Sequence, residues 1–131
     1  MDEAALVHHL RAALPEALAI YVFGSVATGE AGPDSDLDLA VLVAGRADPL
    51  ILWRLAGELA DIAGRRVDLV DLRAASTVMQ YQVVTRGRRL WARDVGAGLF
   101  EAFVLSEKME LDAARSGLVA DIVREGVVHG Q

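Results

Sequence analysis

The chain has 131 residues, which is the length of one domain and leaves little room for a second core. Hydrophobic residues make up 53% of it and charged residues 24%, so we expect a globule rather than a disordered chain. Its net charge of -6 argues against non-specific binding to nucleic acid or to an anionic membrane. The lack of cysteine excludes disulfides, thiolate catalysis and cysteine-ligated zinc.

No targeting or membrane segment is visible. The first ten residues, MDEAALVHHL, lack the basic segment and the long apolar core of a signal peptide. No stretch of about 18 or more uncharged apolar residues is present to span a bilayer. We therefore expect a small, soluble, acidic domain in the cytoplasm.

The first third of the chain reads as helix, strand, turn and strand. Apolar residues at helical spacing predict a helix over 2–14, with Asp2 as its N-cap and Pro15 as its stop. Short apolar runs, partly β-branched, predict buried strands over 17–23 and 37–43.

The remainder continues the alternation. A helix is predicted from Asp48-Pro49 to Gly64, followed by a strand over 66–71. The later elements are a helix over 76–85, a short strand over 89–92, and a helix from 99 to about 125, for which a break at Gly117 stays open. The pattern predicts an α/β chain with a small sheet and helices packed against it.

Gly24-Ser25 follows the first predicted strand and opens a short helical turn. Such a turn leaves backbone N–H groups unpaired at its start, and these groups favour a bound phosphate. Gly24 has no Cβ to keep a phosphate away from the main chain, and the Ser25 hydroxyl adds a donor. Gly24 and Ser25 are therefore candidate nucleotide-binding residues.

Asp36 and Asp38 lie two residues apart at the start of a strand, so their carboxylates point to one face, roughly 6–7 Å apart at the backbone. Two such carboxylates repel each other unless a cation lies between them, and Mg²⁺ takes carboxylates together with substrate phosphates. Asp68 completes a triad if its strand lies beside that of Asp38. Two ions about 3.5–4 Å apart would then support an in-line phosphoryl displacement.

The segment GSVATGEAGPDSDLD carries the spacing Gly-Ser-x10-Asp-x-Asp and resembles the polymerase-β-like nucleotidyltransferase superfamily. Within it the chain is similar to the minimal nucleotidyltransferases, or MNT domains. The resemblance covers the leading helix, the segment above, the VDLVDL strand and the helical tail. It implies a mixed sheet with flanking helices, with a nucleotidyltransferase core over 1–95 and a C-terminal helical extension over 96–131 packed on the same domain.

The resemblance also implies a function. MNT proteins pair with HEPN-domain toxins, so the chain would be an antitoxin that transfers AMP from ATP to a tyrosine of such a toxin. Gly24 and Ser25 would then hold the triphosphate. Asp36 and Asp38 would bind two Mg²⁺ ions. Asp68 would bind the catalytic ion and help to deprotonate the acceptor hydroxyl, whose unperturbed pKa near 10 makes it a poor nucleophile.

Two other functions stay open from the sequence. Transfer to a small-molecule hydroxyl, as in aminoglycoside-modifying relatives, usually needs a second substrate-binding domain, for which this chain is too short unless a dimer supplies the missing wall. A non-catalytic antitoxin would neutralise its partner by binding alone. The complete set of five site residues argues against this second option.

Several other polar residues are candidates for a functional role. Asp71 has the strand parity of Leu69, so we expect it to lie outside the metal site. A basic run around Trp91 could reach a triphosphate or an acidic partner, although we favour a solvated edge strand; its members are Arg86, Arg88, Arg89 and Arg93.

Other side chains have no catalytic role in this interpretation. Trp53 is expected in the core or at a partner contact, Tyr21 lies in a buried strand, and His8 and His9 are expected at the surface. The far end of the last helix is a candidate for the toxin contact through its apolar residues Leu118, Val119, Ile122, Val127 and Val128.

Overall fold

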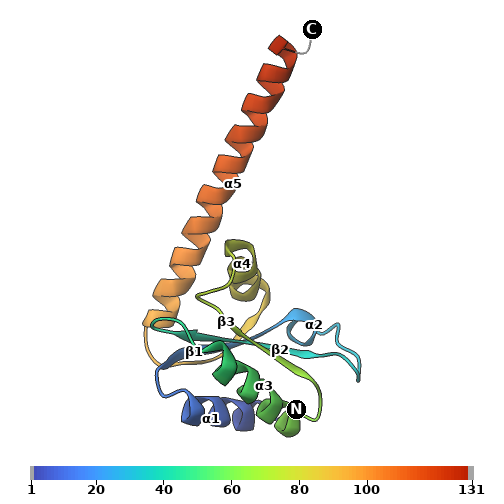
Figure 1. Cartoon of the computed structure of the whole chain (residues 1–131), viewed down its shortest axis with the longest axis vertical. Coiled ribbons are helices and arrows are strands. Elements are labelled where there is room, and N and C mark those ends of the chain that lie inside the picture. Colours follow the sequence, from blue (N-terminus) through green and yellow to red (C-terminus); the bar gives the residue numbers. More distant parts are fainter. Residues whose placement is uncertain (1, 130–131) are drawn as a thin grey trace.

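The computed structural model describes the backbone of residues 2–129 and the side chains of residues 2–118. Figure 1 shows a body of sheet and short helices from which the last helix extends. The elements in chain order are α1 (Glu3–Ala13), β1 (Ala17–Phe23), α2 (Gly24–Thr28), β2 (Leu37–Val43), α3 (Pro49–Ala63), β3 (Val67–Asp71), α4 (Thr77–Arg86), β4 (Arg88–Ala92) and α5 (Gly96–His129).

Helix ends lie where the predicted caps place them. The side chains of Asp2, Asp48 and Ser76 each accept a hydrogen bond of 2.9–3.1 Å from a backbone N–H in the first turn of α1, α3 and α4. Gly64 ends α3 in the left-handed region, with φ +69°. The predicted helices and strands from α1 to β4 are therefore confirmed to within a residue or two.

The four strands form one mixed sheet in the order β3-β2-β1-β4. β2 and β3 run parallel, whereas β1 is antiparallel to both β2 and β4. In this arrangement β1 ends where β2, β3 and β4 begin. We call this end of the strands the site end of the sheet. There Phe23 pairs with Asp38, and Leu37 pairs with Val67. The small mixed sheet with flanking helices is the predicted fold.

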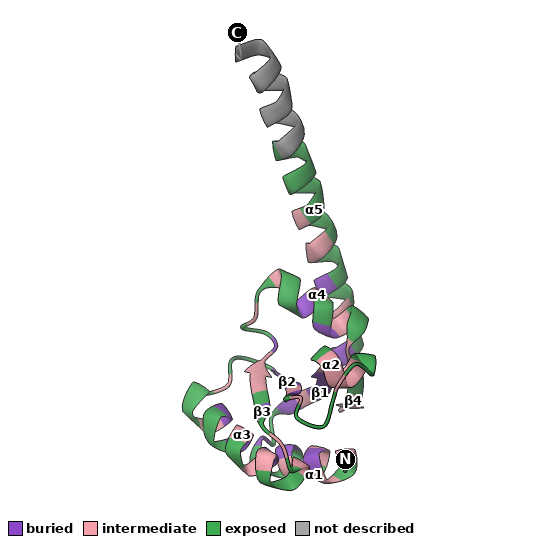
Figure 2. Cartoon of the chain, turned by 90° about the vertical axis from the view of Figure 1, so that its right-hand side faces the viewer, coloured by how far each residue is buried: buried purple, intermediate pink, exposed green. Residues whose placement is uncertain are grey.

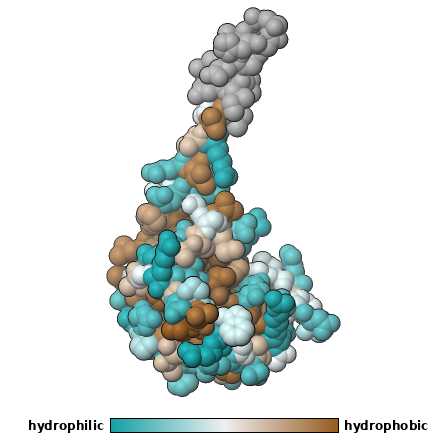
Figure 3. Space-filling view, in the orientation of Figure 1, coloured by the Kyte–Doolittle hydropathy of each residue, from teal (hydrophilic) through white to brown (hydrophobic). Residues whose placement is uncertain are grey.

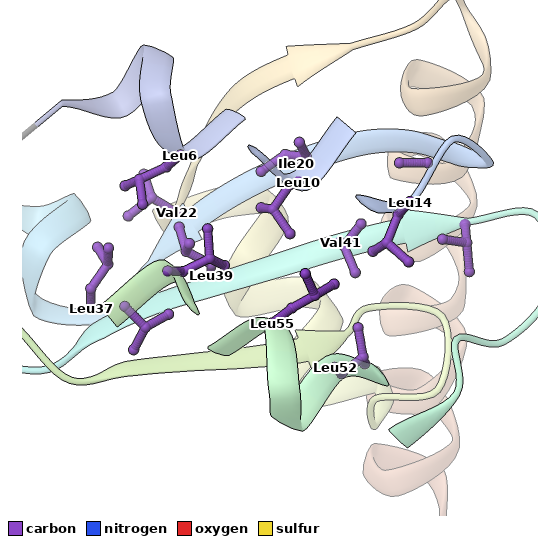
Figure 4. Packing of buried hydrophobic residues seen from close by; sticks show 14 residues of the cluster. Leu6, Leu10, Leu14, Ile20, Val22, Leu37, Leu39, Val41, Leu52 and Leu55 are labelled. Carbon is purple, nitrogen blue, oxygen red and sulfur yellow. The ribbon is translucent and has the colours of Figure 1, made fainter. Parts of the chain in front are cut away.

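The hydrophobic core lies on both faces of the sheet. On one face, α1 and α3 pack on alternate residues of the strands, among them Ile20, Leu39 and Val41 (Figure 4). On the other face, α4 and the start of α5 cover Tyr21 and Leu42. Because β1 and β2 are buried on both faces, their sequences read as continuous apolar runs. Burying one such leucine or isoleucine contributes about 1.5–3 kcal/mol.

α5 is longer than the sequence pattern indicates. It begins at Gly96, whose N–H donates to the Asp94 side chain at 2.8 Å, and it continues through Gly117 to His129 without a break. Among the side chains of α5 that the structure describes, the buried ones lie in the first turns: Ala97, Phe100 and Val104. Figure 2 shows that the described part of the helix beyond them is mostly exposed. The option of a break at Gly117 is therefore wrong.

Some large apolar side chains lie at the surface. Trp53 on α3 is 80% exposed, so of its two expected places the core is wrong and a partner contact stays a prediction. Figure 3 shows further hydrophobic surface along the lower part of α5, where Leu99, Phe103 and Met109 are exposed. Leu118 is exposed as well, whereas the other four side chains of the expected toxin contact lie outside the described residues. No helix in the described part of the chain combines the length and apolar character needed to cross a bilayer.

Candidate active site

Gly24 brings the two halves of the Gly-Ser and Asp-x-Asp pattern together. It follows β1 directly and adopts φ +71°, a conformation that favours glycine. A Cβ added to Gly24 would lie 3.2 Å from Cγ of Asp38 and would collide with Oδ2 of that carboxylate. The backbone of the turn is therefore in direct contact with the side chain of Asp38.

Ser25 lies in the first turn of α2 and is half-buried. No side chain caps the start of this short helix, and its first N–H groups have no intrahelical partner. Gly29 ends α2 with φ +79°, and the Ser25 carbonyl accepts the N–H of Glu30 at 2.9 Å. The turn thus presents backbone donors and one hydroxyl at the site end of the sheet, as the sequence predicts.

The three aspartates lie at one end of the sheet, and Asp38 and Asp68 also share one face. Asp38 and Asp68 are register partners on the parallel strands β2 and β3, which are spaced about 4.8 Å apart. On their strands they alternate in step with Ala40 and Val70, which lie on the face covered by α4 and α5. Asp36 comes two residues before Asp38 in the chain. Burial raises the pKa of Asp38 above its usual range, and the charges of Asp68 and Asp36 raise it further.

Carboxylates placed in this way have the donor chemistry that a divalent cation requires. A cation beside Asp38 would relieve the repulsion that raises its pKa. As the side chains stand, however, no group of three or more His, Cys, Asp or Glu residues in the described part of the chain is arranged to hold a metal ion. Oδ2 of Asp36 instead lies 3.9 Å from Nε of Arg66. The register thus places two carboxylates, those of Asp38 and Asp68, on neighbouring strands, whereas Asp36 would have to turn away from Arg66 to join them at an ion.

Asp71 does not belong to this group, as its strand parity predicts. One of its carboxylate oxygens accepts the N–H of Ala47 at 2.8 Å, and the other accepts the N–H of Arg73 at 3.1 Å. Asp71 therefore holds together the loops that follow β2 and β3, at the opposite end of the sheet from Gly24.

Most of the basic run is bound within the chain. The Arg88 guanidinium donates to both carboxylate oxygens of Glu3, at 2.6 and 3.0 Å, and Arg89 donates to Glu101 at 2.8 Å. Arg93 donates to the carbonyl of Pro15. β4 is an edge strand with Arg88 and Arg89 exposed, which confirms the favoured interpretation.

The sequence pattern misses two polar contacts between distant elements. The Tyr21 hydroxyl donates to Glu101 at 3.0 Å, which joins the buried β1 to α5. His9 on α1 pairs with Glu58 on α3 at 2.6 Å and is only half-exposed. The partners are 80 and 49 residues apart, so no local spacing signals either contact.

A groove of about 590 Å³ runs between α3 and the outer edge of β3. Trp53 and Arg66 are among its lining residues, and so is Asp68. Asp68 itself is exposed and lies on the edge strand of the sheet, on the side away from Gly24-Ser25.

A Gly-Ser turn against paired aspartates on a mixed sheet is the arrangement expected of a nucleotidyltransferase. Residues 7–95 match the family model described as polymerase beta, nucleotidyltransferase, and the chain belongs to this family. The matched segment contains all five predicted site residues.

Individual relatives describe the similarity more closely than the family model does. The protein adenylyltransferase MntA of Shewanella oneidensis is 39% identical over 123 residues, which cover 94% of this chain and 88% of MntA. A crystal structure of a toxin-antitoxin with AMP-PNP contains a chain with a TM-score of 0.84 and 39% identity, covering 94% of this chain and 99% of that chain.

A third comparison concerns a modified toxin. A structure of the tri-AMPylated Shewanella oneidensis HEPN toxin in complex with MNT antitoxin contains a chain with a TM-score of 0.76 and 38% identity, covering 92% of this chain and 95% of that chain. Together with MntA, it confirms the resemblance to MNT nucleotidyltransferases.

Proposed function

We propose that this chain is a protein adenylyltransferase antitoxin, which transfers AMP from ATP to a tyrosine hydroxyl of a HEPN-domain toxin and so neutralises it. The contact of Gly24 with Asp38, with Asp68 in register beside it, is the observation that carries this proposal. The similarity to MntA, to a chain solved with AMP-PNP and to a chain solved with an AMPylated toxin supports it.

The turn at the end of β1 binds the nucleotide. Its open N–H groups and the Ser25 hydroxyl donate hydrogen bonds to the triphosphate, and the absence of a side chain at Gly24 lets the phosphates approach Asp38. ATP is therefore held with its phosphates between α2 and the carboxylates.

Asp36, Asp38 and Asp68 are the residues that would hold Mg²⁺, two ions in the family pattern. Bound there, Mg²⁺ would neutralise phosphate charge and make the acceptor hydroxyl easier to ionise. The chain's own contribution is to fix Asp38 and Asp68 on adjacent strands, so that little reorganisation is needed when the substrate arrives.

Asp68 is the general base in this scheme. It is exposed at the site end of β3 and lines the groove beside α3, so an acceptor tyrosine can reach it from outside. The Asp68 carboxylate accepts the proton of the tyrosine hydroxyl, the tyrosine oxygen bonds to the α-phosphorus, and pyrophosphate leaves. AMP on a tyrosine of a ribonuclease site adds bulk and negative charge where RNA phosphate must bind.

The proposal also covers the domain boundaries of the chain and the compartment in which it acts. We assign residues 1–95 to the nucleotidyltransferase core and 96–131 to a helical extension whose first turns pack on the same domain, which the family match over 7–95 and the buried residues Ala97 and Phe100 support. Because the reaction consumes ATP, we place it in the cytoplasm. The net charge of -6 makes direct binding of nucleic acid or an anionic membrane unfavourable.

Mass spectrometry of the co-expressed toxin tests the function. We expect one or more AMP adducts on a toxin tyrosine, lost with Asp36→Asn or Asp38→Asn. The control is Asp61→Asn, an exposed carboxylate on α3 whose loss leaves the adduct in place.

Two outcomes would contradict the proposal. Neutralisation that survives Asp36→Asn and Asp38→Asn would indicate an antitoxin that acts by binding alone. An unmodified toxin together with AMP transfer to a small-molecule hydroxyl would indicate the other enzyme class.

A further inference from the structure

α4 leads from the far end of the sheet to the site end, on the face that carries the aspartates. Its residues Val83 and Val84 pack in the same cluster as Ala40 and Leu42 of β2, and Asp38 shares the parity of those two β2 residues. The last residue of α4 is Arg86. A cationic side chain therefore stands on the same face and at the same end of the sheet as the carboxylates.

The end of α4 lies against the strand that leads into the phosphate-binding turn. A Cβ added to Gly87 would lie 2.7 Å from the carbonyl oxygen of Val22 and 3.3 Å from Cβ of Phe23. Phe23 is the residue before Gly24, and α4 also contacts α2. Arg86 is thus one residue from a backbone contact with the segment that we propose to hold ATP.

The flank of α4 that carries Arg86 faces away from α5. Tyr81 marks the α5 side, because Nζ of Lys108 lies 4.9 Å from the centre of its ring. At 3.6 residues per turn, Arg86 lies roughly 140° around the helix from Tyr81. Tyr81 and Arg86 therefore lie on opposite flanks of α4, with the buried Val83 on the face between them. The flank of Arg86 is the one that faces α2 and the site.

Arg86 also differs from the rest of the basic run in its contacts. Arg88, Arg89 and Arg93 are held by Glu3, Glu101 and the Pro15 carbonyl. Arg86 is exposed and forms no ion pair with any residue whose side chain the structure describes. A triphosphate that enters beside three carboxylates needs cationic partners, and a guanidinium suits phosphate oxygens well.

We propose that Arg86 binds the triphosphate of ATP from the α4 side, opposite Asp38. This inference rests on the proposed function and adds to it a binding residue outside the family pattern. Arginine would donate to phosphate oxygens beyond the α-phosphate, so it would favour ATP over AMP.

Calorimetric titration of the chain with AMP-PNP and with AMP, both with Mg²⁺, tests the assignment. Arg86→Ala is expected to weaken AMP-PNP binding about ten- to a hundredfold and AMP binding little, with Arg86→Lys in between. The matched control is Arg46→Ala, an exposed arginine in the loop after β2 at the far end of the sheet, which should leave both affinities unchanged.

Three results would overturn the inference. The first is an unchanged AMP-PNP affinity in Arg86→Ala. If transfer of AMP to the toxin is nevertheless slower in this variant, Arg86 contacts the toxin and not the nucleotide. Equal loss of AMP-PNP and AMP affinity with a lower melting temperature would show that Arg86 only stabilises the end of α4. A wild-type chain that binds no AMP-PNP would overturn the proposed function itself.

Discussion

The close approach of Gly24 to Asp38 leaves no space for a side chain at position 24. Gly29 has a similar positive φ, but a Cβ added there would meet nothing within 4 Å. Alanine at either position costs about 1 kcal/mol or more in backbone strain, because φ is left-handed in both. Only Gly24→Ala also pushes on the carboxylate.

We therefore expect both variants to lose unfolding free energy, measured with urea, and only Gly24→Ala to lose AMP-PNP binding, measured by calorimetry. Equal nucleotide affinity in the two variants would show that the contact with Asp38 has no part in binding.

The charge of Asp38 is expected to cost stability in the absence of a cation. Because its pKa is raised in the folded state, the ionised carboxylate destabilises the fold above that raised pKa. The cost declines as the pH falls through the raised pKa, and it is absent below the ordinary pKa of an aspartate. Asp38→Asn should therefore raise the melting temperature by a few degrees at pH 7 and have no effect at strongly acidic pH.

Thermal unfolding followed by circular dichroism measures this effect. Asp61→Asn serves as the control, because this exposed carboxylate lies on α3, which covers the opposite face of the sheet from Asp38. A lower melting temperature for Asp38→Asn at pH 7 would mean that the carboxylate stabilises the fold after all.

Single residues of the site could be predicted where the chemistry is local. The spacing of Gly24, Asp36 and Asp38 can be recognised in the sequence, because the three residues lie in one turn and at the start of the next strand. The alignment of Asp68 with Asp38 depends on the parallel pairing of β3 with β2, which strand parity allows but does not establish. The contact of Arg88 with Glu3 spans 85 residues and has no sequence signal at all.

Among the elements, β1 and α5 are joined by one buried polar contact. The pKa of Tyr21 is raised by burial and by the charge of Glu101, which also holds Arg89. Glu101→Ala would leave the buried hydroxyl without its acceptor and should cost about 1–3 kcal/mol. Tyr21→Phe removes only the donor and should cost about 0.5–1.5 kcal/mol.

Chemical denaturation of both variants measures these costs. Glu110→Ala, an exposed glutamate on the same helix, should change the unfolding free energy by less than about 0.5 kcal/mol. A loss in Glu101→Ala no larger than in this control would show that the contact does not attach α5 to the sheet.

Helices and strands could be predicted where their ends carry a chemical signal. Asp48 and Gly64 fix the ends of α3, and buried strands are visible as apolar runs. The continuity of α5 could not be read in this way, because one glycine costs a helix only about 1 kcal/mol and does not by itself end it. The exposure of Trp53 was equally hidden, because residues 49–53 form an apolar run and its neighbours Leu52 and Leu55 are buried.

In the molecule as a whole, one small sheet carries both halves of the site. Packing on both faces fixes β1 and β2, and the polar residues lie at the end where β1 stops and β2 and β3 start. The groove beside Asp68 is open to the outside.

The proposed convergence of the three aspartates can be observed in a crystal of the chain grown with AMP-PNP and Mn²⁺. Anomalous scattering should give a peak between the carboxylates of Asp38 and Asp68, with Asp36 turned from Arg66 towards it. The triphosphate should lie on the Gly24-Ser25 turn. A nucleotide bound elsewhere, or a turn occupied by triphosphate with no metal peak at Asp38, would contradict the proposed site.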